Sequence, residues 1–321
     1  LFRNTVKEAG LNPYLFEMAN IRDQCSWVHM QHPDAATKKS KDLVRMAVAK
    51  ARLLEPLQKS YIDITKNALV IGGGVAGMSS ALELANQGFK VFLLEKTNEL
   101  GGNLKNIYYL FNGEDPQKKL ERIIKEVQNN PNIEIYFNSK IESVEGSVGN
   151  YKTKIKSNDK EYELGHGIVI IAVGGKEYEP KEYLFGQDER ILTQRQLEEK
   201  IAKNKIKLPE TIVMIQCVGS REGERPSCSR ICCGTAIKNA LKIKEISPKT
   251  NVYILYRDIR AYGFKEKYYT EARDKRVSFI RGDIEDGKPE VLKENGNLYV
   301  KVKNKVLNME HTIPANLVIL S

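Results

Sequence analysis

The sequence predicts an α/β protein that contains two β-α-β units and begins with a short helical segment. Three observations support this fold class. Residues 68–94 run from an apolar strand through a glycine turn and an amphipathic helix to a second apolar strand. Residues 208–280 show the same alternation of strands and helices. Residues 1–60 lack this alternation and carry an apolar stripe at helical spacing over residues 37–54.

The length of 321 residues is sufficient for two domains and a substantial core. The expected parts are an N-terminal helical segment at residues 1–60, a first nucleotide-binding domain at residues 61–207, an inserted second domain at residues 208–310 and a strand at residues 311–321 that returns to the first domain. The chain opens at Leu1 without an initiator methionine and stops directly after an apolar strand, so we also expect a fragment truncated at both ends.

The first β-α-β unit carries a dinucleotide-binding turn, Gly72-x-Gly74-x-x-Gly77. In such a turn the first glycine allows a tight bend, the second lets the backbone approach a pyrophosphate, and the third lets the helix pack against the strand. The free N–H groups at the helix start attract the phosphates. Glu95 ends the next strand, where an acid can accept the ribose hydroxyls. The residues expected around the dinucleotide are Gly72, Gly73, Gly74, Val75, Ala76, Gly77, Glu95 and Lys96.

The residues that follow this unit favour FAD over NAD(H). The motif Leu-Gly-Gly-Asn at residues 100–103 resembles the continuation found in flavin-dependent proteins with two dinucleotide-binding domains. A small-residue turn after the apolar strand at residues 168–172 resembles the turn with which those proteins return to their cofactor. The expected FAD site therefore also includes Gly102, Asn103 and Gly174. NAD(H) remains the alternative ligand.

The second β-α-β unit, at residues 208–280, lacks such a glycine turn. We expect strands at residues 211–216, 252–256 and 277–280, helices at residues 231–246 and 264–274, and a hairpin at Asn295-Gly296. After the first of these strands the sequence has Cys217, Val218 and Gly219 in place of Gly-x-Gly-x-x-Gly. The usual glycine geometry could not hold a pyrophosphate there.

Four of the five cysteines lie between positions 217 and 233, as Cys217, Cys228, Cys232 and Cys233. In a chain without the cysteine density of a secreted domain, such clustering indicates metal or redox chemistry. We expect the four thiolates to converge at a helix N-terminus and to bind a [4Fe–4S] cluster. Zinc would need two closely spaced pairs, and a redox C-x-x-C is absent. Zinc, reactive thiols and unligated structural cysteines remain as alternatives.

The composition is that of an ordinary globular protein, with 41% hydrophobic and 29% charged residues. The net charge of +10 comes from 51 basic and 41 acidic residues spread along the chain. Such a spread, without a nucleic-acid-binding motif, indicates a solvated surface, so we expect no nucleic-acid partner. No apolar run is long enough to span a bilayer. We therefore expect no membrane insertion and a cytoplasmic location.

Several segments resemble the A-type subunits of heterodisulfide reductase. They include IRDQCSWVH, VIGGGVAGMSSALELANQGFKVFLLEK, IQCVGSREGERPSCSRICCGTAIKNALKIKE and YRDIRAYGFKEKYYTEARDKRVSFIRG. The resemblance implies a thioredoxin-reductase-like flavoprotein fold with two Rossmann-like domains, the second of which is converted to hold a [4Fe–4S] cluster. The ferredoxin-type C-x2-C-x2-C-x3-C motifs usual in that family are absent from this sequence.

The same resemblance implies an oxidoreductase of methanogenesis, the FAD and iron–sulfur subunit of an electron-bifurcating CoB–CoM heterodisulfide reductase-like complex. Its implied partners are B- and C-type subunits, a hydrogenase or formate dehydrogenase module, ferredoxin and a second copy of the flavin subunit. The alternative is a conventional NAD(P)H-dependent flavin oxidoreductase of the pyridine nucleotide-disulfide type, which needs a second nucleotide site and an active disulfide. A scaffold without chemistry would have little reason to keep both the glycine turn and the four cysteines.

Two side chains are candidates for tuning the flavin. Lys238 lies on the helix that begins at the cysteines, and a positive charge near the flavin ring would stabilise its reduced forms. A solvated surface lysine explains this position equally well. Glu182, shortly after the small-residue turn, is the second candidate, and a surface position is the preferred interpretation. The YRDIR segment, residues 256–260, follows a strand end and forms either a salt bridge or a partner contact.

Overall fold

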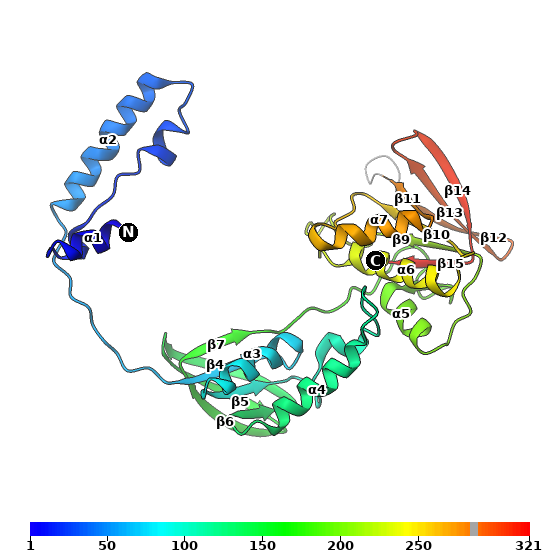
Figure 1. The fold of residues 1–321 in the computed structure, drawn as a ribbon, viewed down its shortest axis with the longest axis horizontal. Helices are drawn as coiled ribbons and strands as arrows, with labels where there is room; N and C mark the ends of the chain where they lie inside the picture. Colours follow the sequence, from blue (N-terminus) through cyan, green and yellow to red (C-terminus); the bar gives the residue numbers. More distant parts are fainter. Residues whose placement is uncertain (283–287) are drawn as a thin grey trace. The chain divides into compact units, whose positions relative to one another are not determined.

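The computed structural model describes residues 1–282 and 288–321. It divides the chain into two compact units, Leu1–Asp63 and Ile64–Ser321 (Figure 1). No helix within the two described ranges is both long and apolar enough to cross a membrane.

The first unit is a small helical segment. It contains α1 (Phe2–Glu8), short helical turns at Pro13–Leu15 and Arg22–Ser26, and α2 (Pro33–Ala51). Helix α2 begins four residues earlier than predicted, with Pro33 at its first position. A proline fits there because the first N–H of a helix has no partner within the helix and because the φ of proline is already close to the helical value. Cys25 is buried in this unit, and its thiol donates a hydrogen bond to the Ala36 carbonyl at 3.0 Å.

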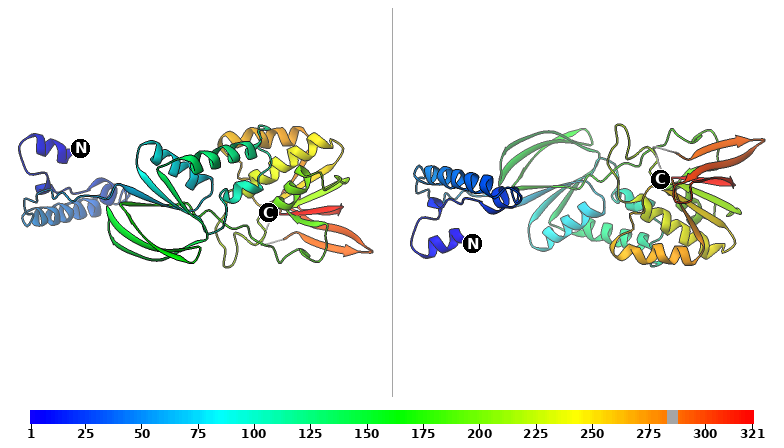
Figure 2. Two further views of the ribbon diagram at one scale, coloured as in Figure 1. Left: turned by 90° about the horizontal axis from the view of Figure 1, so that it is seen from below. Right: turned by 90° about the horizontal axis from the view of Figure 1, so that it is seen from above.

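The second unit begins with a parallel sheet in the order β3-β2-β1-β7. Its elements are β1 (Asn67–Ile71), α3 (Val75–Asn86), β2 (Lys90–Leu94), α4 (Pro116–Asn129), β3 (Ile133–Tyr136) and β7 (Ile168–Ile171), with an antiparallel meander of β4 (Ser139–Ser147), β5 (Asn150–Ser157) and β6 (Lys160–His166). Successive residues of β1 point to opposite faces. Val70 packs with Met78 of α3, whereas Leu69 packs with Ile155 of β5. Helices therefore cover one face of the sheet and the meander covers the other (Figure 2).

A second parallel sheet has the order β11-β10-β9-β15-β8. Its elements are β8 (Ile191–Thr193), α5 (Gln194–Ala202), β9 (Thr211–Ile215), α6 (Cys232–Ile246), β10 (Asn251–Tyr256), α7 (Glu266–Asp274), β11 (Val277–Arg281) and β15 (Leu317–Leu320), beside an antiparallel sheet of β12 (Glu290–Glu294), β13 (Asn297–Asn304) and β14 (Met309–Ala315). Asn295 and Gly296 both have positive φ, as the tight turn of a hairpin requires, and they join β12 to β13. Residues 283–287 of the predicted second domain lie outside the described residues.

The last strand does not return to the first domain, so that prediction is wrong. β15 lies between β9 and β8, with Val318 paired to Val213 on one side and to Ile191 on the other. β8 and α5, which the sequence pattern assigns to the first domain, belong to the same second sheet. A run of apolar residues fits the centre of any parallel sheet, so the pattern alone could not distinguish the two. The Asn316 side chain helps to hold β15 beside β9, because its Oδ1 accepts a hydrogen bond from the Thr211 N–H at 2.9 Å.

Candidate functional site

The turn between β1 and α3 admits no side chain at two of its glycines. Gly72 has a φ of +111°, and a Cβ atom there would lie 2.4 Å from the Ala172 carbonyl oxygen. A Cβ atom on Gly77 would lie 1.8 Å from the Gly72 carbonyl oxygen. Both separations are too short for any side chain, so only glycine allows this bend and this close approach of α3 to β1. The start of α3, with its unpaired N–H groups, is thereby held at the carboxyl end of β1.

Glu95 reaches this turn from the end of β2. Its carboxylate is buried, and its Oε2 accepts a hydrogen bond from the Gly73 N–H at 2.7 Å. Its Oε1 accepts a second bond from the Thr97 N–H at 2.9 Å. The carboxylate of Glu95 therefore lies against the glycine turn, where it could accept a hydrogen bond from a ribose hydroxyl. Lys96, the next residue, is exposed.

The motif at residues 100–103 and the turn after β7 lie beside the same glycines. Gly101 forms a backbone bridge with Gly74, and a Cβ atom on Gly102 would lie 2.9 Å from the Gly74 Cα. Asn103 Nδ2 donates a hydrogen bond to the Gly175 carbonyl at 2.8 Å. The carboxyl ends of β1, β2 and β7 thus bring together the predicted residues Gly72, Gly73, Gly74, Val75, Ala76, Gly77, Glu95, Gly102, Asn103 and Gly174.

The equivalent position in the second domain is built differently. Cys217 follows β9 with a φ of +63° and is buried. A Cβ atom on Gly219 would lie 2.1 Å from Cε1 of Tyr178. The tyrosine ring therefore fills the space beside Gly219. Gly219 makes room for an aromatic side chain of the same protein.

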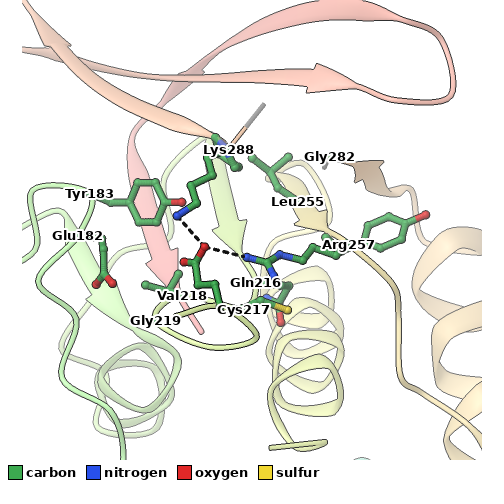
Figure 3. Close-up of a pocket in the computed structure, with 13 residues that line it drawn as sticks. Glu182, Tyr183, Gln216, Cys217, Val218, Gly219, Leu255, Arg257, Gly282 and Lys288 are labelled. Carbon is green, nitrogen blue, oxygen red and sulfur yellow. Dashed lines mark ion pairs between the residues drawn. The ribbon is translucent and has the colours of Figure 1, made fainter. Parts of the chain in front are cut away.

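A cavity of about 200 Å³ lies beside Cys217 at the carboxyl ends of β9 and β10 (Figure 3). Gln216 lines it, and the Gln216 Oε1 is buried without a hydrogen-bond partner among the residues that the structure describes. The carboxylate of Glu222 lies 2.7 Å from Lys288 Nζ and 3.6 Å from Arg257 Nη2. These two ion pairs are the dashed lines of Figure 3. Charged side chains thus line part of the cavity, and in these ion pairs one carboxylate faces two cations.

The four cysteines Cys217, Cys228, Cys232 and Cys233, here called the cluster cysteines, lie between the end of β9 and the first turn of α6. Cys232 and Cys233 are the first two residues of α6, and Cys228 belongs to the loop before it. All of them are free thiols. Cys228 Sγ accepts a hydrogen bond from the Arg230 N–H at 3.3 Å, and Cys232 Sγ lies 3.1 Å from Ser229 Oγ.

The four sulfur atoms interact electrostatically. Burial raises the pKa of Cys233 to about 11, and the neighbouring Cys232, Cys217 and Cys228 add to the rise because like charges disfavour one another. Across residues 1–282 and 288–321, no three His, Cys, Asp or Glu side chains stand in positions that would hold a metal ion. Four free thiols fit an iron–sulfur cluster in number and chemistry, and binding one would require the sulfur atoms to draw together.

Lys238 is not a solvated surface residue, so that alternative is wrong. Its Nζ lies 2.8 Å from Glu198 Oε2, and the two side chains are 10% and 3% exposed. It also donates a hydrogen bond to the Tyr109 carbonyl at 3.1 Å. Tyr109 follows the short helix η3 (Gly102–Asn106) of the first domain, and its hydroxyl donates to Asn239 Oδ1 at 2.9 Å. Lys238 therefore helps to hold a first-domain segment on the second domain, and its role near a flavin stays a prediction.

Glu182 lines the cavity beside Cys217. Its carboxylate accepts hydrogen bonds from the Tyr178 hydroxyl at 3.2 Å and from the Lys181 N–H at 2.8 Å. The structure thus places Glu182 near the cysteine loop of the second domain. Its role beside a flavin stays a prediction.

Sequence reasoning missed the ion pairs that hold the cysteine loop. Arg221 pairs with Asp258, and Arg257 pairs with Glu222 across the same loop. The available signal was the YRDIR segment, for which a salt bridge and a partner contact were equally good interpretations. The structure shows a salt bridge.

Known proteins resemble this chain along its whole length. Residues 66–215 match the pyridine nucleotide-disulphide oxidoreductase family. The chain is 34% identical to the second A-type iron-sulfur subunit of the CoB–CoM heterodisulfide reductase of Methanopyrus kandleri, in a match that covers 100% of this chain and 63% of that protein. It is 33% identical to the A-type subunit of the H2:CoB–CoM heterodisulfide,ferredoxin reductase of Methanothermobacter thermautotrophicus, over 95% of this chain and 60% of the relative.

The chain therefore spans about three fifths of the length of these relatives. The match with the Methanopyrus kandleri protein runs over 419 positions, whereas this chain has 321 residues. Part of that relative inside the matched region consequently has no counterpart here.

Solved structures share the fold. The thioredoxin reductase of Lactococcus lactis superposes with a TM-score of 0.53 at 18% identity, over 79% of this chain and 76% of that chain. The FAD-bound cadaverine monooxygenase DfoA of Erwinia amylovora superposes with a TM-score of 0.52 at 9% identity, over 81% of this chain and 78% of that chain. At these identities the likeness concerns the fold alone, and it confirms the predicted thioredoxin-reductase-like α/β fold. The chain is thus homologous along its whole length to the A-type subunits of heterodisulfide reductase, a family of oxidoreductases.

Proposed function

We propose that this chain is the FAD- and [4Fe–4S]-binding electron-transfer subunit of a CoB–CoM heterodisulfide reductase-like complex. One observation carries the proposal. The glycine turn at residues 72–77, Glu95 and residues 100–103 form a dinucleotide cradle in the first domain, and the second domain carries four free thiols between β9 and the first turn of α6. The names of the two relatives support it, since one is called an iron-sulfur subunit while the other belongs to a heterodisulfide,ferredoxin reductase. Because the chain spans only part of those relatives, its activity, substrates and partners all belong to the proposal.

The first-domain cradle would hold the dinucleotide of FAD. Its centre is open, because a Cβ atom on Gly74 would meet nothing closer than the Gly102 Cα at 3.9 Å. The start of α3 would direct its N–H groups at the pyrophosphate, and Glu95 would accept the ribose hydroxyls. When bound, FAD supplies the ability to take up two electrons together and to release them singly.

The four cysteines would ligate the cluster through their thiolates. Cys217 comes from the end of β9, Cys228 from the loop, and Cys232 and Cys233 from the first turn of α6. The helix N-terminus favours the anionic form of the sulfur atoms. An all-sulfur donor set is soft and suits iron–sulfur chemistry.

Electrons from one donor pair leave by separate routes, one towards the heterodisulfide and one towards ferredoxin. The partners are B- and C-type subunits, a hydrogenase or formate dehydrogenase module and a second copy of this chain. The complex works in the cytoplasm. Lys238, and less directly Glu182, would adjust the charge near the flavin.

A conventional NAD(P)H-dependent flavin oxidoreductase is the second candidate, because residues 66–215 match the pyridine nucleotide-disulphide family. Such an enzyme would need a nucleotide site at the end of β9. The Tyr178 ring already lies against Gly219 there. Rapid oxidation of NADPH or NADH by the purified protein with an artificial acceptor would favour this candidate.

The test is the cofactor content of anaerobically purified protein, measured as flavin, iron and acid-labile sulfide together with the visible spectrum. Wild-type protein should hold one FAD and about four irons per chain. Cys232→Ser should lose iron and keep FAD, because the two sites lie in different domains. Cys25→Ser is the matched control, since Cys25 lies in the first unit and outside the four cysteines. Flavin without iron in strictly anaerobic wild-type protein would reject the cluster.

A further inference from the structure

A segment of the first domain lies on helices of the second domain. Residues 108–111, here called the strap, belong to the connection between η3 and α4. The Tyr108 N–H donates a hydrogen bond to Glu198 Oε1 of α5 at 2.8 Å. The Phe111 ring stacks on the ring of Tyr268 in α7, with 4.3 Å between the ring centroids. The two ends of the strap thus contact two different helices of the second domain.

The middle of the strap is held on α6 by buried polar groups. The Tyr109 hydroxyl donates to Asn239 Oδ1, and the fully buried Asn239 side chain donates from Nδ2 to Gln194 Oε1 at 2.8 Å. Lys238 Nζ donates to the Tyr109 carbonyl and lies 4.8 Å from the centroid of the Tyr109 ring. If the strap moved away, these buried groups would lose hydrogen bonds. The strap therefore has one preferred position on the second domain.

The chain that leads into the strap begins in the dinucleotide cradle. Helix η3 starts with Gly102 and Asn103, which lie beside the glycine turn. The Gln117 side chain of α4 donates from Nε2 to the carbonyls of Leu104 at 2.9 Å and Ile107 at 2.6 Å. These two bonds fasten the residues just before the strap to the first domain. A displaced strap would consequently disturb η3 and the cradle residues at its start.

The chain also crosses to the second domain from the edge of the cradle. Residues 172–190 lead from β7 in the first sheet to β8 in the second sheet. Asn103 Nδ2 donates its hydrogen bond to the carbonyl of Gly175 in this crossing segment. The strap and the crossing segment are therefore two connections to the second domain that both begin at residues of the cradle.

We propose that the strap couples the FAD cradle to the orientation of the second domain. The inference rests on the proposed function, because FAD is the proposed ligand of the cradle. A filled cradle holds η3 and the crossing segment in one arrangement, and both connections pass that constraint to the second domain. Such coupling is reciprocal, so a loosened strap weakens FAD binding and an empty cradle allows a wider range of domain orientations.

The experiment loosens the strap and leaves the buried ion pair between α5 and α6 in place. Tyr109→Phe combined with Phe111→Ala removes one hydroxyl and one ring from the strap. The matched control, Tyr61→Phe combined with Phe89→Ala, removes the same groups from side chains that are exposed. All proteins have the full chain. FAD is removed from each, and its affinity is measured by fluorescence titration.

The strap variant should bind FAD about tenfold more weakly than wild-type protein, a coupling of ordinary size. The control should keep the wild-type affinity. A second readout is the distance between spin labels at the exposed residues Lys125 of α4 and Lys249 after α6, measured by pulsed electron paramagnetic resonance. The labels are introduced as unnatural amino acids, so that the native cysteines stay unchanged. Addition of FAD should narrow the distance distribution in wild-type protein, and the distribution should stay broad in the strap variant.

The outcomes separate this inference from the proposed function. Wild-type protein that does not bind FAD would reject the proposed FAD site itself. Equal FAD affinity in the strap variant and the control would reject the coupling alone, and so would a wild-type distance distribution that FAD leaves unchanged. If circular dichroism shows that the double variant does not fold, Tyr109→Phe is compared with Tyr61→Phe by the same two measurements. Y109F should then bind FAD more weakly than Y61F, and equal affinities would again reject the coupling.

Discussion

Single residues decide whether the first-domain cradle can form. The backbone of α3 approaches β1 so closely that the Gly77 position has no room for a methyl group, since the nearest atom is the Gly72 carbonyl oxygen. That carbonyl belongs to the backbone, so it cannot rotate away as a side chain could. The same turn receives the Glu95 carboxylate, so a displaced helix would also disturb the acid.

Gly77→Ala should therefore abolish stoichiometric FAD binding and lower the free energy of unfolding by about 1–3 kcal/mol, the usual range for overpacking. Flavin content after purification and urea denaturation measure the two effects. Gly165→Ala is the matched control, because a Cβ atom there would meet nothing within 4 Å. Normal FAD content in G77A would contradict the assignment of the cradle.

A charged cluster joins two elements of the second domain. Asp188, just before β8, accepts hydrogen bonds from Arg190 Nε at 2.8 Å and Nη2 at 2.7 Å. Lys293 of β12 lies 3.0 Å from the same carboxylate, and the Asp188 side chain is only 5% exposed. The hydrogen bonds from Arg190 in the first place, and from Lys293 in addition, hold the pKa of Asp188 well below its ordinary value.

This shift predicts how stability depends on pH. Because the pKa of Asp188 is lower in the folded protein, its contribution is fully present above about pH 4, the ordinary pKa of an aspartate, and is lost as the pH falls towards the folded pKa. Asp188→Asn should cost about 2 kcal/mol at neutral pH and progressively less in acid. Urea denaturation between neutral pH and pH 3 would measure this. Asp159→Asn removes an exposed ion pair and should leave the pH dependence of stability unchanged. A loss of stability in D188N that is the same at all pH values would contradict the charge-based explanation.

Helices α5 and α6 share the buried pair of Glu198 and Lys238. Removal of one partner from such a pair leaves the other charge buried without compensation. Glu198→Gln should therefore cost about 3–5 kcal/mol in the free energy of unfolding. The double variant Glu198→Leu with Lys238→Met should recover much of that loss. Glu199→Gln removes an exposed partner from the next position and should change stability little, and a similar loss in both single variants would show that burial is not the cause.

The whole chain consists of two separately packed units joined by an extended segment. Residues between Ala51 and Asn67 contain no helix or strand, and Leu53 and Tyr61 are 83% and 90% exposed. The predicted FAD and cluster residues all lie in the second unit, Ile64–Ser321.

A chain that begins at Ile64 should therefore fold, bind FAD and keep the melting temperature of the corresponding transition in the full chain. Differential scanning calorimetry and flavin content would test this. Loss of FAD from the shortened chain would show that the first unit contributes to the cofactor site.

Trypsin should cut the full-length chain first in the segment between the two units, for example after Lys59. Mass spectrometry would identify the product.

Much of the local structure was predictable because it follows from periodicity and glycine stereochemistry. The helix expected at residues 231–246 is observed as Cys232–Ile246, and the strand expected at residues 277–280 as Val277–Arg281. The glycine turn and Glu95 were recognisable for the same reason, since their spacing along one β-α-β unit determines where they meet.

Contacts between distant segments were decided only by the tertiary structure. The sequence by itself determined that residues 317–320 form a buried strand, but packing in three dimensions determined that the strand joins β9 and β8. It likewise placed Lys238 on a helix, whereas its partner Glu198 lies 40 positions away in the chain. The Tyr178 ring at Gly219 and the pairing of Arg221 with Asp258 leave no periodic pattern. Apolar spacing specifies which face of an element is buried, and it carries no information about which charged or aromatic group another element will bring to that face.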